Sequence, residues 1–186
     1  MHDGYHHGDL RAQVLSTAAE IIADTGADGL SLRELARRAG VSHAAPAHHF
    51  GDRRGLFTAL AAEGFQLLAD ALAPSVEKGE FDRTAVAYVR FAVTHAGHYA
   101  IMFRADLLDQ TDTLLGEARR RTGRLLGDGL ASLDATSLVI NRADAQRAAW
   151  ALVHGIATLA INGALPGTKP ERLALVAAHQ LFPPAI

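Results

Sequence analysis

Two short helical patterns, separated only by the three residues Gly40 to Ser42, constrain the fold of this chain most strongly. The first pattern opens with Ser-Leu-Arg-Glu. There the Ser31 hydroxyl can accept the amide hydrogen of Glu34 while the Glu34 carboxylate reaches back, which predicts a capping box. Gly40 is expected to end this helix, and Ser42 is expected to be the N-cap of the next one. Two helices joined by a short glycine-containing turn form a helix-turn-helix.

Pro46 fits the second helix only near its start. With Ser42 as N-cap, Pro46 is the fourth helical residue and loses at most the first intrahelical hydrogen bond. A helix that starts one residue later loses none. The helix carries small side chains at Ala44, Ala45 and Ala47, so another surface can approach its backbone closely. The second helix of such a unit can lie in the major groove of DNA, with its N-terminal amides toward phosphate.

Positive charge is concentrated in the same part of the chain. The whole sequence of 186 residues has 18 Lys and Arg against 20 Asp and Glu, a net charge of −2 that gives no sign of nucleic acid. The window of 24 residues from Ser31 to Arg54 is basic by contrast, with five arginines and three histidines against Glu34 and Asp52. A solvated helix face would explain this charge equally well, so charge alone does not distinguish a DNA-binding surface from an ordinary exposed helix. The helical pattern has to make that distinction.

Composition excludes several classes of protein. The chain has no cysteine, so it has no disulfide or thiolate metal site, and it suits a reducing cytoplasm. The N-terminus is polar and has no apolar signal segment. The longest uncharged apolar run, Ala148 to Ile161, is shorter than the roughly 20 residues of a membrane span and predicts a buried helix.

Helical periodicity continues along the chain and predicts an all-α fold. We expect a helix-turn-helix domain over residues 1–54 and a second helical domain over 55–186. The segment from Ala131 to Asn141 is expected to be a connection, although Ser-Leu-Val-Ile within it could pass for a strand. The remaining expected helices are Gly8–Thr25, one from Asp52 to near Pro74, Thr84–Ala96, His98–Leu108, Asp112–Leu130, Arg142–Ala164 and Lys169–Leu181.

The helix from Arg142 to Ala164 is apolar nearly all round, so it is expected to be buried nearly all round. The same helix of a second copy is the simplest partner, because twofold packing is the commonest arrangement of a homo-oligomer. Twofold symmetry also suits a palindromic DNA site. The expected interface on this helix consists of Ala149, Leu152, Val153, Ile156 and Ala160.

The segment LSLRELARRAGVSHAAPAHHFGDRRGLFTAL, Leu30 to Leu60, resembles the DNA-binding signature of the TetR-type transcriptional regulators, and the resemblance covers roughly residues 8–60. HAGHYAIMF, from His95, and WALVHGIATLAINGAL, from Trp150, resemble the C-terminal subgroup named for its Trp-His-Gly residues. One position departs from the family. Ala47 stands where members commonly carry an aromatic residue that meets a phosphate, so that contact is lost or passes to His48.

The resemblance implies a cytoplasmic, ligand-responsive repressor. It would be a homodimer, with an N-terminal three-helix bundle that contains the helix-turn-helix and a C-terminal helical domain for effector binding and dimerisation. Its partner would be double-stranded DNA with a palindromic operator, and it would need no cofactor. Dimerisation through the last two long helices would add Leu175 to the interface. The expected DNA-binding residues are Ser31, Arg33, Ser42, His43, Ala44, His48, His49, Arg53 and Arg54.

An apolar pocket between helices is expected to bind the effector, with histidines as its polar points. Its expected residues are Phe65, Tyr88, Phe91, His95, Tyr99, Phe103, Trp150 and His154. Each aromatic residue taken singly is equally consistent with an ordinary core position.

Two alternatives stay open at this point. The ten histidines could indicate a metal-binding protein or enzyme, but no HExxH, G-x-S-x-G or glycine-rich phosphate loop is present, so we expect neither catalysis nor a metal. Ala47 could instead indicate a helical interaction module that has lost DNA binding.

Overall fold

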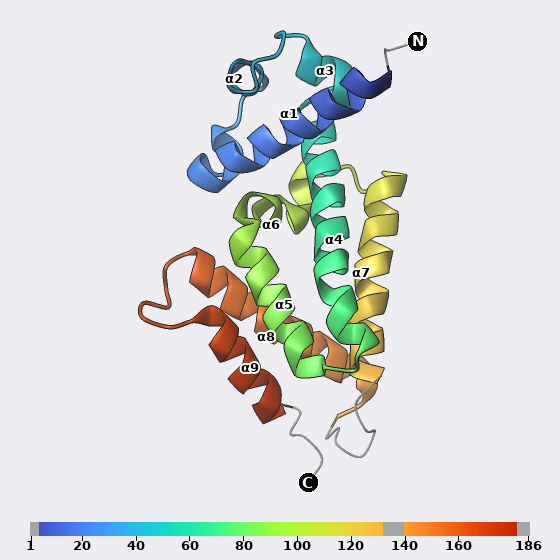
Figure 1. Ribbon diagram of the computed structural model, residues 1–186, viewed down its shortest axis with the longest axis vertical. Coiled ribbons are helices and arrows are strands. Elements are labelled where there is room, and N and C mark those ends of the chain that lie inside the picture. Colours follow the sequence, from blue (N-terminus) through green and yellow to red (C-terminus); the bar gives the residue numbers. More distant parts are fainter. Residues whose placement is uncertain (1–3, 132–139, 182–186) are drawn as a thin grey trace. The chain divides into compact units, whose positions relative to one another are not determined.

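The structure is a computed structural model that describes residues 4–131 and 140–181, so most of the connection expected over Ala131 to Asn141 lies outside the described residues. The described residues form nine α-helices, two short 3-10 helices and no strand (Figure 1). They fall into two compact units. Unit one comprises residues up to 65 and 95–118, and unit two comprises residues 66–94 and from 119 onward. One continuous helix, α4 (Arg53–Glu77), contributes to both units.

Most of the remaining bounds lie within a few residues of those expected from the sequence. The helix expected over His98–Leu108 is the exception, because a shorter α-helix and a separate 3-10 helix stand in its place. In unit one, the helices are α1 (Gly4–Thr25), α2 (Leu32–Arg38), α3 (Ala45–Phe50) and α6 (Ala96–Met102), with η1 (Ala27–Gly29) and η2 (Ala105–Leu107). In unit two, they are α5 (Phe81–Thr94), α8 (Arg142–Ile161) and α9 (Pro170–Leu181). The helix α7 (Thr113–Ala131) begins in unit one and continues in unit two.

The capping box at Ser31 is only half formed. The Ser31 hydroxyl accepts the amide of Glu34 at 3.2 Å, as expected. The Glu34 carboxylate does not reach back; it accepts two hydrogen bonds from Arg37, at 2.8 and 2.6 Å. Arg37 lies one helical turn further on, where its planar guanidinium can hold both carboxylate oxygens. The hydrogen bonds and charge of Arg37 lower the pKa of Glu34.

The second helix of the pair starts later than the sequence suggested. The N-cap of α3 is Ala44 rather than Ser42, and Ser42 instead forms a turn in which its carbonyl accepts the amide of Ala45 at 3.0 Å. Pro46 is therefore the second helical residue and loses no intrahelical hydrogen bond. Ala45 and Pro46 are buried, which corrects the expectation that Ala45 lies on the exposed face.

A tight corner separates α3 from α4. Gly51 has a φ of 77°, which favours glycine, and Asp52 caps α4 by accepting the amide of Gly55 at 2.8 Å. A Cβ at Gly55 would lie 2.0 Å from the carbonyl oxygen of Phe50. The Gly-Asp-x-x-Gly spacing at the start of α4 thus follows from backbone packing.

The helix α4 continues past Pro74, where the sequence predicted its end, and stops at Glu77. Pro74 lies in the last turn and has no amide hydrogen to donate to the carbonyl four residues earlier, so the helix lacks one hydrogen bond there and ends within the same turn. The next residue, Ser75, donates to the carbonyl of Leu72 at 2.9 Å and shares a hydrogen bond of 2.9 Å with the hydroxyl of Thr84. By length and hydropathy α4 could span a membrane, but 61% of the relevant window is buried in the protein, as in a core helix.

Within unit one, α6 packs on the backbone of α1. A Cβ at Gly97 would lie 1.9 Å from the carbonyl oxygen of Ala19, so only glycine fits this contact. Because α6 begins at Ala96, His98 lies within the helix rather than at its expected start. It is buried, and its Nε2 is 2.9 Å from a carboxylate oxygen of Glu63.

We predict that Gly97→Ala lowers the free energy of unfolding by about 1–3 kcal/mol, because the added methyl group forces α1 and α6 apart. Gly123→Ala is the matched control: Gly123 is also helical, but no atom lies within 4 Å of the methyl group that alanine would add there. The control should be neutral or stabilising by up to about 1 kcal/mol. Urea unfolding followed by circular dichroism measures both, and equal stability of the two variants would contradict the contact.

Candidate nucleic-acid interface and ligand cavity

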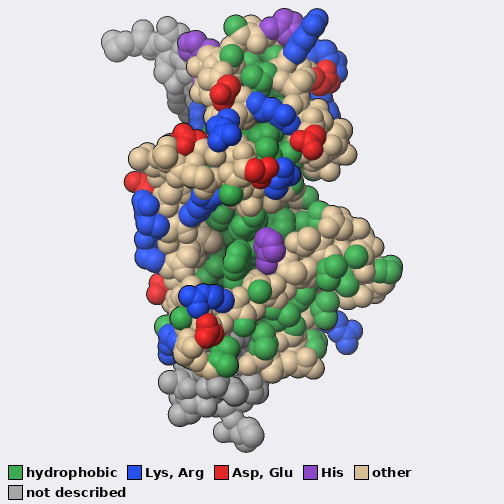
Figure 2. Space-filling model, turned by 180° about the vertical axis from the view of Figure 1, so that it is seen from behind, with side chains coloured by type: hydrophobic (Ala, Val, Ile, Leu, Met, Phe, Trp, Pro, Cys, Tyr) green, Lys and Arg blue, Asp and Glu red, His purple; other side chains and the backbone are tan. Residues whose placement is uncertain are grey.

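The start of α3 presents small and basic side chains on one exposed surface. Ser42, His43, Ala44, Ala47 and His48 are all exposed, and His49 is half-buried. Arginine and histidine side chains gather on the part of the surface formed by α2 and α3 (top of Figure 2). The structure therefore brings together most of the residues that the sequence assigned to DNA.

Ser31 and Arg33 lie on the exposed side of α2. Arg33 has no ion-pair or hydrogen-bond partner among the described residues, in contrast to Arg37, which pairs with Glu34, and Arg38, which is 3.9 Å from Asp24. Arg33 is therefore the arginine of α2 that is available to an external phosphate.

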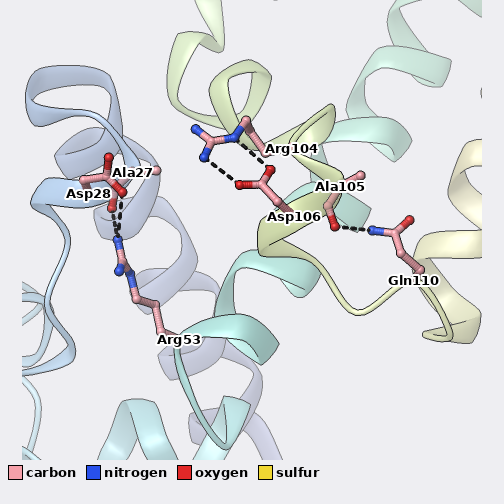
Figure 3. A network of polar contacts seen from close by, with 7 residues as sticks. All are labelled: Ala27, Asp28, Arg53, Arg104, Ala105, Asp106 and Gln110. Atoms are coloured by element: carbon pink, nitrogen blue, oxygen red, sulfur yellow. Dashed lines mark hydrogen bonds and ion pairs between the residues drawn. The ribbon is translucent and has the colours of Figure 1, made fainter.

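Arg53 and Arg54, both expected to bind DNA, have partners inside unit one. The Arg53 guanidinium donates to the carbonyl of Ala27 and lies 3.9 Å from the Asp28 carboxylate (Figure 3). It also stacks over the ring of Phe57. Arg54 donates to the carbonyl of Leu108 at 3.2 Å. The carbonyl partners of Arg53 and Arg54 lie 26 and 54 residues away in the sequence, so no local pattern could have revealed them.

A second ion pair lies close to the Arg53 contact. Arg104 holds Asp106 through two hydrogen bonds, at 3.0 and 2.8 Å, and Gln110 donates to the carbonyl of Ala105 at 3.0 Å (Figure 3). The hydrogen bonds with Asp106 raise the pKa of Arg104, and the charge of Asp28 adds a smaller increase. Asp28 therefore lies in the field of two arginines, Arg53 and Arg104.

Unit two contains a small apolar cavity of about 30 Å³ between α5, α7, α8 and α9. Of the expected ligand residues, Tyr88 and Trp150 line it. The lining residues that sequence reasoning missed include Phe81, which precedes the expected start of its helix, and Gln146, a polar side chain in an apolar wall. The other lining residues are Thr84, Ala85, Leu126, Leu130, Ala149, Leu152, Val153, Ala178 and Leu181.

A hydrogen-bonded relay adjoins this cavity. The Trp150 indole donates to the Tyr88 hydroxyl at 3.3 Å, and that hydroxyl lies 3.2 Å from Nδ1 of His154. The Tyr88 hydroxyl can donate to Nδ1 only if His154 is neutral there. Burial lowers the pKa of His154, which favours this neutral form.

The other expected ligand residues occupy different places. In unit one, the centroid of the Phe103 ring lies 5.5 Å from that of Phe65 and 5.4 Å from that of Tyr99. The ring centroids of His95 and His98 are 5.9 Å apart. In unit two, Phe91 is buried. The structure therefore divides the expected set between the two units, and the cavity of unit two contains only part of it. Within the described part of the chain, no group of three or more His, Asp or Glu side chains could hold a metal ion.

The expected dimer residues lie mainly inside unit two. Val153 and Ile156 are each only 6% exposed, while Ala149 and Leu152 line the cavity and Ala160 and Leu175 are half-buried. This face of α8 turns inward because α5 and α9 pack against α8 in the same chain. Apolar side chains gather on the lower part of the face shown in Figure 2. The large exposed apolar side chains of α8 and α9 are Trp150, Leu159, Ile161, Val176 and Leu181.

We predict that His154 makes unit two less stable in mild acid. Above a pH of roughly 6.5 the imidazole is neutral in both folded and unfolded chains. As the pH falls below that value, the unfolded chain binds the proton first, so the free energy of unfolding decreases until the pH has passed the lowered pKa of the folded state. His154→Gln should lose less stability between about pH 7.5 and 5 than the native chain. An unchanged pH dependence in His154→Gln would contradict this role.

Comparison with known proteins places these features in one family. Residues 14–60 match the family described as bacterial regulatory proteins, tetR family. Residues 81–181 match the family described as Tetracyclin repressor-like, C-terminal domain. The HTH-type transcriptional repressor AcnR of Corynebacterium glutamicum is 29% identical over 126 residues, which cover 64% of this chain and 67% of AcnR.

Solved structures agree with the sequence matches. A Rhodococcus sp. RHA1 protein of unknown function is 36% identical, with a TM-score of 0.79 over 97% of both chains. AibR, solved with isovaleryl coenzyme A and operator DNA, has the same fold at 19% identity, with a TM-score of 0.68 over 95% of this chain and 100% of AibR. Since the two family matches together cover most of the chain, including both the helix-turn-helix and the helices around the cavity, this protein belongs to the TetR family of DNA-binding transcriptional regulators.

Proposed function

We propose that this chain is a transcriptional repressor that binds a palindromic operator as a homodimer and leaves it when a small, mostly apolar ligand binds. The observation that carries the proposal is the exposed surface at the start of α3, where His43 and His48 flank small side chains in a helix-turn-helix. Small residues allow close approach to base edges, and the imidazoles supply hydrogen bonds. Arg33, exposed and unpaired among the described residues, supplies a phosphate contact.

Ala47 fits this proposal, although it cannot donate a hydrogen bond to phosphate. It is exposed on α3 next to His48, which has a ring nitrogen to offer in its place. Arg54 is exposed and keeps further guanidinium nitrogens beyond the one that binds the carbonyl of Leu108, so it can serve as a second phosphate contact. Arg53 instead uses its guanidinium mainly to bind the carbonyl of Ala27.

The ligand is proposed to enter the cavity beside the Tyr88 relay. At about 30 Å³ the cavity holds little more than a water molecule, whereas pockets for small organic ligands measure roughly 300–1,000 Å³. The ligand must therefore select a state in which the helices around the cavity have moved apart. Its apolar wall favours a hydrocarbon chain, and AibR, which shares the fold, was solved with an acyl thioester of coenzyme A. A coupling of about 1–3 kcal/mol between ligand and operator would be ordinary.

The proposed dimer face lies on the outward sides of α8 and α9. Ala151, Gly155 and Leu159 follow one another at intervals of four residues on α8, and Leu159 and Val176 of α9 are each 47% exposed. A second copy related by a twofold axis would cover these side chains and would present two copies of α3 to a palindromic site. This face replaces the inward side of α8, where Val153 and Ile156 are already covered.

DNA contact is tested by two substitutions with different expected signatures. Arg33→Ala should weaken binding to all duplexes alike and reduce the slope of log affinity against log salt by about one per monomer, because a phosphate contact is lost. His48→Ala should instead change preference at particular operator positions, at a cost of about 1–3 kcal/mol per lost contact. Fluorescence anisotropy across a salt series and selection from random duplexes measure these effects.

The control for DNA contact is Arg124→Ala, which removes an exposed arginine of α7. It should leave both the slope and the base preference unchanged. A native chain that binds duplexes without any sequence preference would support the alternative of an interaction module that has lost operator recognition.

The dimer face is tested most sharply at Gly155. Apart from the adjoining backbone of α8 itself, no atom of the described residues lies within 4 Å of a Cβ placed there, so Gly155→Leu should leave the monomer folded. If α8 packs closely against a second copy, the new side chain should convert the dimer to a monomer in analytical ultracentrifugation and weaken operator binding. Gly123→Leu, at the equally open helical glycine of α7, should remain a dimer. A Gly155→Leu chain that still sediments as a native dimer would exclude this face.

A further inference from the structure

Unit two has a second hollow, separate from the cavity, on the other side of α5. It is an open groove of about 240 Å³ formed by the last turns of α4, the connection after it and the outer face of α5. Its charged side chains are Lys78, Glu80, Arg83 and Arg90, and Pro74 and Ala87 form part of its apolar floor. We call it the basic groove.

Helix geometry places two arginines at the two ends of this groove. Arg83, Ala87 and Arg90 are spaced by four and three residues, so they share one face of α5. Seven residues of helix span about 10 Å, which is the separation of the two arginines along the axis. The face of Thr84 and Tyr88, which lines the cavity, points in another direction around the helix.

The cations of the basic groove are not neutralised within the described chain. The side chains of Lys78, Arg83 and Arg90 have no ion-pair or hydrogen-bond partner among the described residues. Two nearby acids are already engaged: Asp70 binds Arg121 at 2.6 Å, and Asp82 lies 3.1 Å from a ring nitrogen of His179. Glu80 is the one carboxylate among the described lining residues, so three positive charges face one negative charge.

We propose that the basic groove binds the diphosphate group of a small molecule whose apolar or ring portion rests on the floor near Pro74 and Ala87. Guanidinium groups hold phosphate oxygens through paired, charge-assisted hydrogen bonds, and two of them about 10 Å apart can close on a diphosphate from both sides. The apolar floor distinguishes the groove from a flat basic track along a nucleic-acid backbone. This site is independent of operator recognition by α3.

Binding in the groove would change the hydrogen bonding of a residue that lines the cavity. Ser75 lines the groove, Thr84 lines the cavity, and their hydroxyl groups share a hydrogen bond of 2.9 Å. Both residues are buried, so a shift of one side chain changes the hydrogen bonding of the other. An anion that pulls Arg83 or Lys78 therefore acts on the wall that encloses the apolar ligand.

Titration of the full chain with inorganic pyrophosphate and with adenosine diphosphate, followed by calorimetry, tests the proposal. We expect saturable binding that weakens as salt increases. Adenosine diphosphate should bind more tightly than pyrophosphate, because its ring covers the apolar floor. The double variant Arg83→Gln/Arg90→Gln should weaken binding roughly tenfold or more, since two charge-assisted contacts are lost. Arg124→Gln, which removes an exposed arginine of α7, should leave affinity unchanged.

Three results would overturn the proposal. Non-saturable binding, or equal loss in the double variant and in Arg124→Gln, would mean an adventitious ion only. Unchanged pyrophosphate affinity in the double variant would place the anion elsewhere. A loss of duplex affinity in the double variant, without a loss of pyrophosphate affinity, would make the groove a nucleic-acid contact. Operator selection with the native chain is measured separately, so failure of this proposal and failure of repressor function are distinguishable.

Discussion

The contact between Arg53 and the turn at Ala27 is the interaction on which the helix-turn-helix depends. Arg53 opens α4, and its guanidinium reaches the carbonyl of Ala27 and the carboxylate of Asp28 in η1, the short helix that precedes α2. Its Nε is buried without a hydrogen-bond partner among the described residues, so the cost of burying the cation must be offset by these contacts and by the ring of Phe57. The same helix, which is 25 residues long, continues into unit two. The residue that fixes the entrance to the DNA-binding helices therefore belongs to the helix that also contributes to the unit containing the cavity.

Unit two uses α5 as a wall shared by two hollows of opposite character. One face of α5 carries Thr84 and Tyr88 toward a small, apolar cavity. Another face carries Arg83 and Arg90 toward an open groove, where their side chains have no partner among the described residues. If the effector binds in this cavity, as proposed, it needs about ten times the present volume and can enter only after α5, α8 and α9 have adopted a second arrangement. Only a different affinity of the effector for the two arrangements can change operator affinity.

Local signals in the sequence predicted the fold well because each one is decided within a few residues. The buried stripe of α1, the glycine after it and the Ser31 cap all follow from helical spacing and backbone chemistry. The predicted start of α3 was wrong because Ser42 does not cap the helix, and the observed start depends on burial of Ala45 and Pro46 in unit one.

Long-range contacts are the part that spacing could not identify. The partners of Arg53 and Arg54 lie 26 and 54 residues away, and the cavity combines four helices. The inward face of α8 was assigned to a second copy because an apolar face does not reveal whether its partner lies in the same chain. In the structure that partner is α5 and α9.

Selection of duplexes from a random pool by the native chain, with sedimentation of the resulting complex, is the sharpest test of twofold operator recognition. We predict enrichment of a palindromic sequence whose half-sites are separated by about one helical turn of DNA or a multiple of it, bound by two or more chains per duplex. Affinity for that sequence should exceed affinity for random duplex by about a thousandfold or more at physiological salt. An enriched site without twofold symmetry, a single chain per duplex, or no enrichment at all would contradict recognition of an operator by a dimer.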